Sequence, residues 1–214
     1  MKKLKIKEYI KKDYKFDRKT LIAITSLIIV ISGVFGWLYE FIFYYFNSGM
    51  KQFYMRGGNF LPFINIYAYG ALIICFLTYK KRKQPLKVFL ISALSCGSLE
   101  LVSGFVMEKV RYGIRCWSYN EEILNFGNIG GYVCLRSVLF FGLSGLLLIY
   151  IILPIIFNLA RKCNKKWFFI ISITICSIFV LDELYNLIFC RLLFLPRAST
   201  IYKKFGLKYI YFNR

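Results

Sequence analysis

Long uncharged apolar runs constrain this chain more than any other feature. Residues 21–39 contain no charged side chain, and similar runs recur along the 214 residues. The chain is 58% hydrophobic and 20% aromatic, which is more apolar surface than a soluble domain of this length buries. A helix of about 20 apolar residues is long enough to cross a bilayer. The runs therefore predict an all-α polytopic transmembrane helix bundle in the cell membrane.

We expect about five spans between a basic N-terminal segment at residues 1–19 and a basic C-terminal tail at residues 191–214. The transmembrane helical domain would cover residues 20–190. Its spans are predicted at residues 20–46, 62–79, 86–107, 137–160 and 167–189. The fifth uncharged run, 167–181, is shorter than the roughly 20 residues that a span needs. Its helix is therefore expected to carry Asp182 into the membrane.

The basic residues predict how the chain is oriented. Lysine and arginine gather in the N-terminal segment and in the connections "YKKRKQPLK" and "ARKCNKK". The positive-inside rule places these three segments on the cytoplasmic side, so the N-terminus is cytoplasmic. The connections at residues 47–61 and 109–136 then face outward. Five spans would leave the basic C-terminal tail outside, although its charge favours the inside. Either the fifth span re-enters near Asp182, or the tail lies on a membrane surface.

The composition also excludes several functional classes. The net charge of +20 would suggest nucleic-acid binding in a soluble protein, but here the basic residues lie between apolar runs, and topology explains them. No nucleic-acid partner is therefore expected. The chain has no histidine, the commonest general base and metal ligand, and no CxxC pair for zinc. It also lacks the GxxxxGK[ST] motif for ATP. We expect no catalysis, no metal and no cofactor.

Six charged residues are expected at one level of the bilayer, toward its outer side. At about 1.5 Å per helical residue, the acids inside the spans and the arginines that precede spans two and four fall at similar depth. They are Glu40, Arg56, Glu100, Glu108, Arg136 and Asp182. A charge inside a bilayer costs about 2.5–3.5 kcal/mol, so such groups face protein, opposite charge or water. These six are the candidate substrate- or ion-binding residues.

Small residues accompany the acids on two predicted helices, at spacings of three or four residues. In the first span they are Gly33 and Gly36 with Glu40, and in the third Gly97 and Gly104 with Glu100 and Glu108. Small residues let helices approach closely, so these glutamates should face protein. Two interpretations stay open: a polar site or ion pathway that opens outward, and buried ion pairs that only fix helix packing. Asp182 has a third interpretation, that it simply ends a short span.

A series of short motifs runs through the chain in a fixed order. Gly36, Trp37 and Glu40 form G-W-x-x-E, and the stretch "RGGNFLPFINIYAYG" follows. Leu99, Glu100, Gly104, Glu108 and Lys109 form L-E-x-x-x-G-x-x-x-E-K, and "GGYVCLR" ends at Arg136. Over residues 27–188 these motifs resemble the bacterial membrane family named ABC-transporter type IV, CmpB-like. The chain departs from that family's pattern at Leu61, Asn65 and Ala68, where the family favours Gly, Pro and Gly.

The resemblance implies a permease-like component of a membrane transport system. With no nucleotide motif of its own, the chain would take energy from a separate ATPase subunit or an ion gradient. Glu40, Glu100 and Glu108 would coordinate a cation, carry protons or pair with Arg56 and Arg136. Besides the lipid bilayer, a second copy of the chain stays open as a partner.

Two other functions stay open as well. One is a membrane interaction or regulatory subunit whose charge cluster is purely structural. The other is a membrane-embedded enzyme that acts on lipid or envelope precursors with Glu or Asp as the base. The absence of histidine and of a nucleophile motif counts against the enzyme.

Overall fold

Helices make up nearly all of the regular structure in the computed structural model, which describes residues 6–11, 13–51, 54–110, 115–206 and 208–209. The expected all-α fold class is confirmed. The outermost parts of the N-terminal segment and the C-terminal tail, residues 1–5 and 210–214, lie outside the described residues. The longer helices are α2 (Arg18–Asn47), α3 (Asn65–Thr78), α4 (Pro85–Val110), α5 (Leu135–Leu147), α6 (Leu153–Lys162) and α7 (Lys165–Leu184). The shorter ones are α1 (Ile6–Lys11), α8 (Cys190–Leu192), α9 (Ala198–Lys204) and the turns η1 (Tyr79–Lys81), η2 (Tyr119–Glu121), η3 (Leu148–Ile152) and η4 (Tyr185–Phe189).

Within the described chain, four helices are long and apolar enough to cross a membrane. They are α2, α4, the continuous helix Leu135–Lys162 and the continuous helix Lys165–Leu192. The expectation of about five spans is roughly consistent with these four and α3. Helix α3 has 14 residues, fewer than the roughly 20 that cross a bilayer.

Helix α3 is short because its N-terminal flank cannot be helical. Gly57 and Gly58 have φ angles of 87° and 88°, in the left-handed region that glycine adopts without strain. Pro62 then supplies no amide hydrogen for a helix interior. Residues 56–64 consequently lead into α3 without forming a helix.

A π-helical turn, η3, joins α5 to α6 just before Pro154. Proline cannot donate a backbone hydrogen bond, and its ring presses on the carbonyl group four residues earlier. A π-turn widens the helix locally and relieves such a clash. The helix therefore continues through Pro154.

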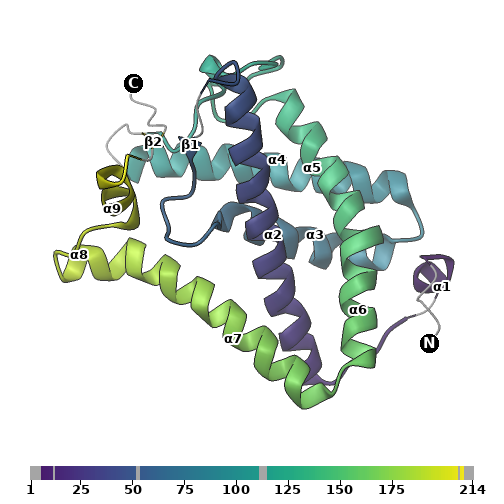
Figure 1. Cartoon of the computed structure of the whole chain (residues 1–214). Coiled ribbons are helices and arrows are strands. Elements are labelled where there is room, and N and C mark those ends of the chain that lie inside the picture. The colour runs from purple at the N-terminus through teal and green to yellow at the C-terminus, as the bar shows by residue number, and fades with distance from the viewer. Residues whose placement is uncertain (1–5, 12, 52–53, 111–114, 207, 210–214) are drawn as a thin grey trace.

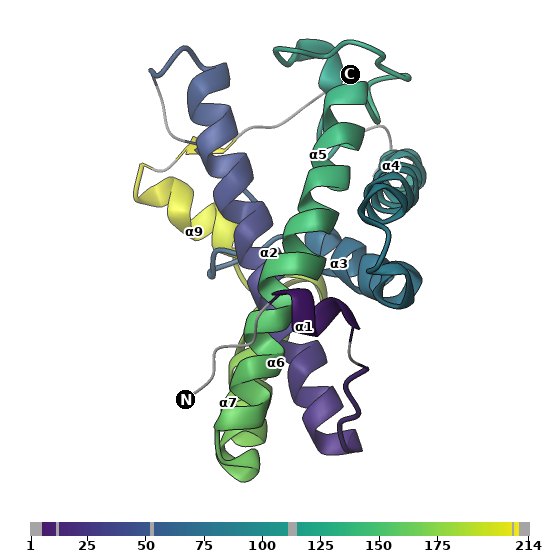
Figure 2. The same ribbon diagram turned by 90° about the vertical axis from the view of Figure 1, so that its right-hand side faces the viewer.

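The long helices do not form a simple parallel bundle. Figure 1 shows α2 and the α5–α6 helix running roughly antiparallel, while α3 and α4 cross them and α7 diverges from the N-terminal end of α2. Figure 2 shows α4 nearly end-on beside α5. Helix α4 packs on α5, α2 packs on α3 and α7, and α3 packs on α4.

Glycine residues of α2 allow its close contact with α3 and the segment before it. A Cβ atom built on Gly33 would lie 2.1 Å from the ring of Phe63, and one on Gly36 would lie 2.1 Å from the ring of Tyr67. No larger residue fits there while these rings keep their places. The close approach expected from the glycine spacing on this helix is confirmed.

The expected buried face of α4 is also confirmed. Gly97, Glu100, Gly104 and Glu108 are all buried. Glu100 is 7% exposed and Glu108 2%. Buried acids need polar partners, so the function of these two carboxylates depends on the groups that surround them.

The N-terminal segment packs against α6 and the residues that follow η1. Tyr9 of α1 is fully buried, and its ring centroid lies 5.9 Å from that of Phe157. Arg82, which follows η1, donates from Nε to the Tyr9 carbonyl at 3.3 Å and forms an ion pair of 2.6 Å with Asp13. A buried arginine thus connects the N-terminal segment to the bundle.

The C-terminal segment lies at the opposite end of α2, beside the segment that carries Arg56. The short strand β2 (Lys208–Tyr209) pairs in parallel with β1 (Tyr54–Met55). The Tyr202 hydroxyl donates to the Phe60 carbonyl at 2.9 Å. The tail thus packs on the loop at residues 47–61 that the sequence places outside, although its basic charge favours the inside.

Candidate functional site

An ion pair between Glu40 and Arg56 lies near the C-terminal end of α2. Arg56 Nε is 2.5 Å from Glu40 Oε2, and the two side chains are 9% and 16% exposed, arginine first. The guanidinium carbon of Arg56 also lies 4.3 Å from the centroid of the Tyr44 ring, a favourable cation–π arrangement. Pairing is one of the three roles expected for Glu40.

A second ion pair joins Arg136, in the first turn of α5, to Glu122. Arg136 Nη2 lies 2.6 Å from one oxygen of Glu122, and the Tyr44 hydroxyl donates to the other. Burial raises the pKa of the Glu122 carboxyl, while the hydrogen bond from Tyr44 and the Arg136 charge oppose the rise. The Arg136 guanidinium also lies over the Phe43 ring, 4.1 Å from its centroid. Glu122 was not among the predicted site residues.

Glu100 of α4 is held differently, by neutral hydroxyl groups. The Tyr119 hydroxyl donates to Oε1 at 2.5 Å, and the Ser137 hydroxyl lies 2.8 Å from Oε2. Among the residues that the structure describes, no lysine or arginine forms an ion pair with Glu100. It therefore differs from Glu40 and Glu122, each of which is neutralised by its own arginine.

These groups surround a small polar cavity of about 40 Å³. Its walls include both ion pairs and Glu100, so they hold three carboxylates and two guanidinium groups. Aromatic side chains make up most of the remaining lining: Tyr39, Phe43, Tyr44, Tyr67, Trp117, Tyr119, Phe140 and Phe141. On this measure a single water needs roughly 10–15 Å³, so the cavity has room for a few waters. Its lining carries one carboxylate that no guanidinium neutralises.

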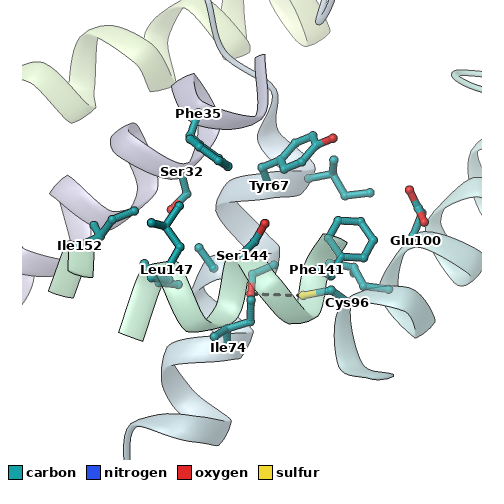
Figure 3. A pocket seen from close by; sticks show the side chains of 15 residues that line it. Ser32, Phe35, Tyr67, Ile74, Cys96, Glu100, Phe141, Ser144, Leu147 and Ile152 are labelled. Carbon is teal, nitrogen blue, oxygen red and sulfur yellow. Dashed lines mark hydrogen bonds between the residues drawn. The ribbon is translucent and has the colours of Figure 1, made fainter. Parts of the chain in front are cut away.

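A second cavity, of about 50 Å³ and almost wholly apolar, adjoins the first. The two cavities share four wall residues, Ile66, Tyr67, Glu100 and Phe141. Figure 3 shows Glu100 at one end of the apolar cavity and Ile152 at the other. We call these four shared residues the partition. It separates the polar cavity, a charged compartment, from the apolar cavity, and it includes Glu100 and Tyr67.

Glu108 lies on the same face of α4 but does not line either cavity. Its Oε2 accepts from Arg115 Nε at 2.8 Å and from the Tyr132 hydroxyl at 2.7 Å. A Cβ atom on Gly104 would lie 3.0 Å from Trp117 and 3.1 Å from Tyr132. Glu108 and Gly104 therefore anchor the connection between α4 and α5.

Asp182 lies apart from the cavity as well, and it does not end its helix, because α7 continues to Leu184 and η4 follows. Its carboxylate accepts from the backbone N–H groups of Phe60 and Leu61 at 3.1 and 2.7 Å. Asn186 Nδ2 also donates to it at 2.9 Å. Asp182 thus holds the segment before α3 against the end of α7.

Of the six predicted residues, the structure places four around the polar cavity: Glu40, Arg56, Glu100 and Arg136. Four further residues were not predicted from the sequence: Glu122, Tyr119 and Ser137 in that site, and Arg115, the partner of Glu108. Three of these lie in or beside the connection between α4 and α5, whose path no periodic pattern reveals. Among the described residues, no group of three or more Cys, Asp or Glu side chains could hold a metal ion.

Comparison with protein families gives one match. The family described as Putative ABC-transporter type IV matches residues 27–187, about three quarters of the chain. The match includes all six predicted site residues and each of the missed ones. No curated protein and no solved structure matches the chain.

Proposed function

Since the chain belongs to the Putative ABC-transporter type IV family, we propose that it is a permease-like component of a membrane transport system and not an enzyme. Its path would begin at the polar cavity between α2, α4 and α5 and continue through the partition into the apolar cavity. Energy would come from a separate ATPase subunit or from an ion gradient. The N-terminus would lie in the cytoplasm of a cell whose membrane the four long helices cross.

One observation carries this proposal. The two cavities share four wall residues, among them Glu100 and Tyr67, so a charged compartment and an apolar compartment are separated by side chains and not by a full helix. Purely structural ion pairs need no such adjoining space. Each cavity has room for only a few waters, so transport through them would require the partition to open.

Thiol labelling from outside the cell tests the proposal. In a cysteine-free background, single cysteines would replace Tyr39 on α2 and Phe140 on α5, which line the polar cavity. A membrane-impermeant thiol reagent should label both in intact cells, because a transporter must open its site to water at times. Absence of labelling in well-expressed variants would contradict the proposal.

Neighbouring positions supply matched controls. Leu38 and Leu139 precede the two test residues, are 47% and 42% exposed and do not line the cavity. In a membrane their exposed sides face lipid, so cysteines there should stay unlabelled. Labelling of the controls as well as the test positions would indicate a distorted protein, and the variants would then be repeated at Phe43 and Phe141.

A membrane interaction or regulatory subunit is the second candidate, and one observation favours it. Glu40, Glu122 and Glu108 are each paired with an arginine, at 2.5, 2.6 and 2.8 Å. Buried pairs of this kind can fix an arrangement of helices without binding anything. This function predicts that no cavity position is labelled from either side of the membrane.

A further inference from the structure

The hydroxyl group of Ser137 has two acceptors and only one hydrogen. Its Oγ lies 2.8 Å from Glu100 Oε2 and 2.8 Å from the Cys134 carbonyl oxygen. It also accepts from the Cys134 backbone N–H at 3.3 Å. A serine hydroxyl donates one hydrogen bond and accepts two. It can therefore donate to the carboxylate or to the carbonyl, but not to both at once.

Both choices give a fully bonded arrangement, and they differ by one proton. With Glu100 ionised, Ser137 donates to Oε2. With Glu100 protonated on Oε2, the carboxyl donates to Ser137 Oγ, and the serine hydroxyl turns toward the Cys134 carbonyl. That carbonyl keeps its helical bond from Val138 N at 3.1 Å in either case. The two protonation states thus require the rotation of one hydroxyl and no shift of a heavy atom.

The Tyr119 hydroxyl fits both states as well. It donates to Glu100 Oε1 at 2.5 Å, and this oxygen accepts equally as part of a carboxylate or as the carbonyl oxygen of a carboxylic acid. No acceptor is left without a donor when the proton leaves, and no donor is left without an acceptor when it arrives. Since unsatisfied buried polar groups cost about 1–3 kcal/mol each, neither state carries that penalty.

The charge around the cavity requires a positive partner for Glu100. Glu40 and Glu122 have arginines within 2.6 Å, which leaves Glu100 as the surplus carboxylate of the lining. An isolated buried carboxylate is costly, so a proton or a cation must neutralise it. Among the described residues, no group of three or more Cys, Asp or Glu side chains could hold a metal ion, and two hydroxyl groups already bond to the oxygens of Glu100 at 2.5 and 2.8 Å. The smallest cation, a proton, fits without displacing either hydroxyl.

We propose that Glu100 and Ser137 form a binding site for one transferable proton, loaded from water in the polar cavity. On loading, a hydronium ion gives its proton to Glu100 Oε2 and becomes water, while the Ser137 hydroxyl turns from Glu100 to the Cys134 carbonyl. On release the proton passes to a water molecule and the hydroxyl turns back. The role of this proton in driving transport rests on the proposed function, whereas the binding itself does not.

Infrared difference spectroscopy on the full chain in lipid vesicles tests the proposal. As the pH is lowered, the wild-type protein should gain an absorption band from the carbonyl stretch of a buried carboxylic acid and lose it reversibly when the pH is raised. Glu100→Gln should lack this band. Glu108→Gln is the matched control, because Glu108 is equally buried on the same helix face but is paired with Arg115, and this variant should keep the band.

Ser137 variants test the two-acceptor arrangement. Ser137→Ala should shift the position of the band and the pH midpoint of its appearance, because both protonation states lose their shared partner. Ser137→Thr retains the hydroxyl and should restore the wild-type values. Tyr119→Phe should shift the band while leaving Ser137 in place. This variant tests whether the band belongs to Glu100 if Glu100→Gln does not fold.

Three results would overturn the proposal: a wild-type protein without a titrating band, a band that persists in Glu100→Gln, and a band that Ser137→Ala leaves unchanged. The spectroscopy needs no substrate, so it separates this proposal from the proposed function. A titrating Glu100 without external thiol labelling would refute transport but not the proton site. Thiol labelling without a titrating band would refute the proton site but not the transport function.

Discussion

The ring of Tyr67 on α3 occupies the space that a side chain at Gly36 on α2 would need. A Cβ atom on Gly36 would lie 2.1 Å from Tyr67 Cγ. Because Tyr67 also lines both cavities, this contact sets the distance between two helices and the position of the partition between the cavities.

Gly36→Ala should therefore destabilise the protein by about 1–3 kcal/mol, the usual cost of overpacking, and alter the partition between the cavities as Tyr67 is displaced. The midpoint of thermal unfolding in detergent measures the loss. Gly70→Ala is the control, since its added Cβ would lie 3.3 Å from Cys96 Sγ and needs only a small adjustment. Equal losses in the two variants would contradict this account of Gly36.

Removal of one partner of the Glu40–Arg56 pair should be more harmful than removal of both. Glu40→Gln or Arg56→Met alone strands a buried charge, at a cost of about 3–5 kcal/mol. The double variant leaves no stranded charge, so its unfolding free energy should exceed that of either single variant. Chemical unfolding of the wild type, the two single variants and the double variant in micelles would measure these free energies as a double-mutant cycle.

The exposed pair between Lys165 and Asp17 offers a comparison for that cycle. Its atoms lie 3.4 Å apart and its side chains are 77% and 48% exposed. Solvent weakens such pairs, so the loss of this ion pair in Asp17→Asn should lower the unfolding free energy much less than Glu40→Gln or Arg56→Met does. Additive effects at Glu40 and Arg56 would argue against a coupled buried pair.

Asp182→Asn should loosen the segment before α3. An asparagine amide is neutral and has one acceptor oxygen, so one of the N–H groups of Phe60 and Leu61 loses its acceptor and the other no longer bonds to a charged one, and such a charged bond is worth about 1.5–3 kcal/mol. Hydrogen–deuterium exchange at these two amides should accelerate. Thr174→Ala, at an exposed position on the same helix, should leave their exchange unchanged. Unaltered exchange in Asp182→Asn would show that other contacts hold the segment.

The docking of the N-terminal segment should weaken in acid. The hydrogen bond and charge of Arg82 lower the pKa of the Asp13 carboxyl below its ordinary value. A group whose pKa is lower in the folded state stabilises that state above its unfolded pKa, and this contribution is lost as the pH falls through the folded value. The ordinary pKa of aspartate is about 3.9, so the loss should begin below that pH.

Limited proteolysis near Tyr14 with an acid-active protease would follow this release. Wild-type protein should become more sensitive as the pH falls, whereas Asp13→Asn should be sensitive throughout and show less pH dependence. Asp17→Asn tests specificity, because Asp17 bonds to Thr20 and Lys165 but not to Arg82. The same pH dependence in Asp13→Asn and wild type would exclude Asp13 as the titrating group.

Much of the fold follows from patterns that the sequence displays. Long apolar runs predict the spanning helices, and the repeat of Gly97, Glu100, Gly104 and Glu108 predicts the buried face of α4, because three- and four-residue spacings share a helix face. These signals are local. Depth along a helix also brought Glu40, Arg56, Glu100 and Arg136 to the same part of the protein.

The partners of those charges could not be predicted in the same way. Glu122 reaches Arg136, and Arg115 reaches Glu108, through a connection with few periodic apolar residues, so no pattern fixes its path. The short length of α3 depends on backbone preferences at Gly57, Gly58 and Pro62. The mean hydropathy of this stretch of sequence does not reveal those preferences. The hydroxyl partners of Glu100 were missed because serine and tyrosine occur in so many other settings.

The hydrogen bonds that Asp182 accepts from Phe60 and Leu61 determine which substitutions this segment can tolerate. The carboxylate binds peptide N–H groups and not side chains, and every residue except proline supplies that group. Substitutions at positions 60 and 61 can therefore accumulate without loss of this anchor. What positions 60 and 61 share is a peptide N–H group that binds Asp182, and not a type of side chain.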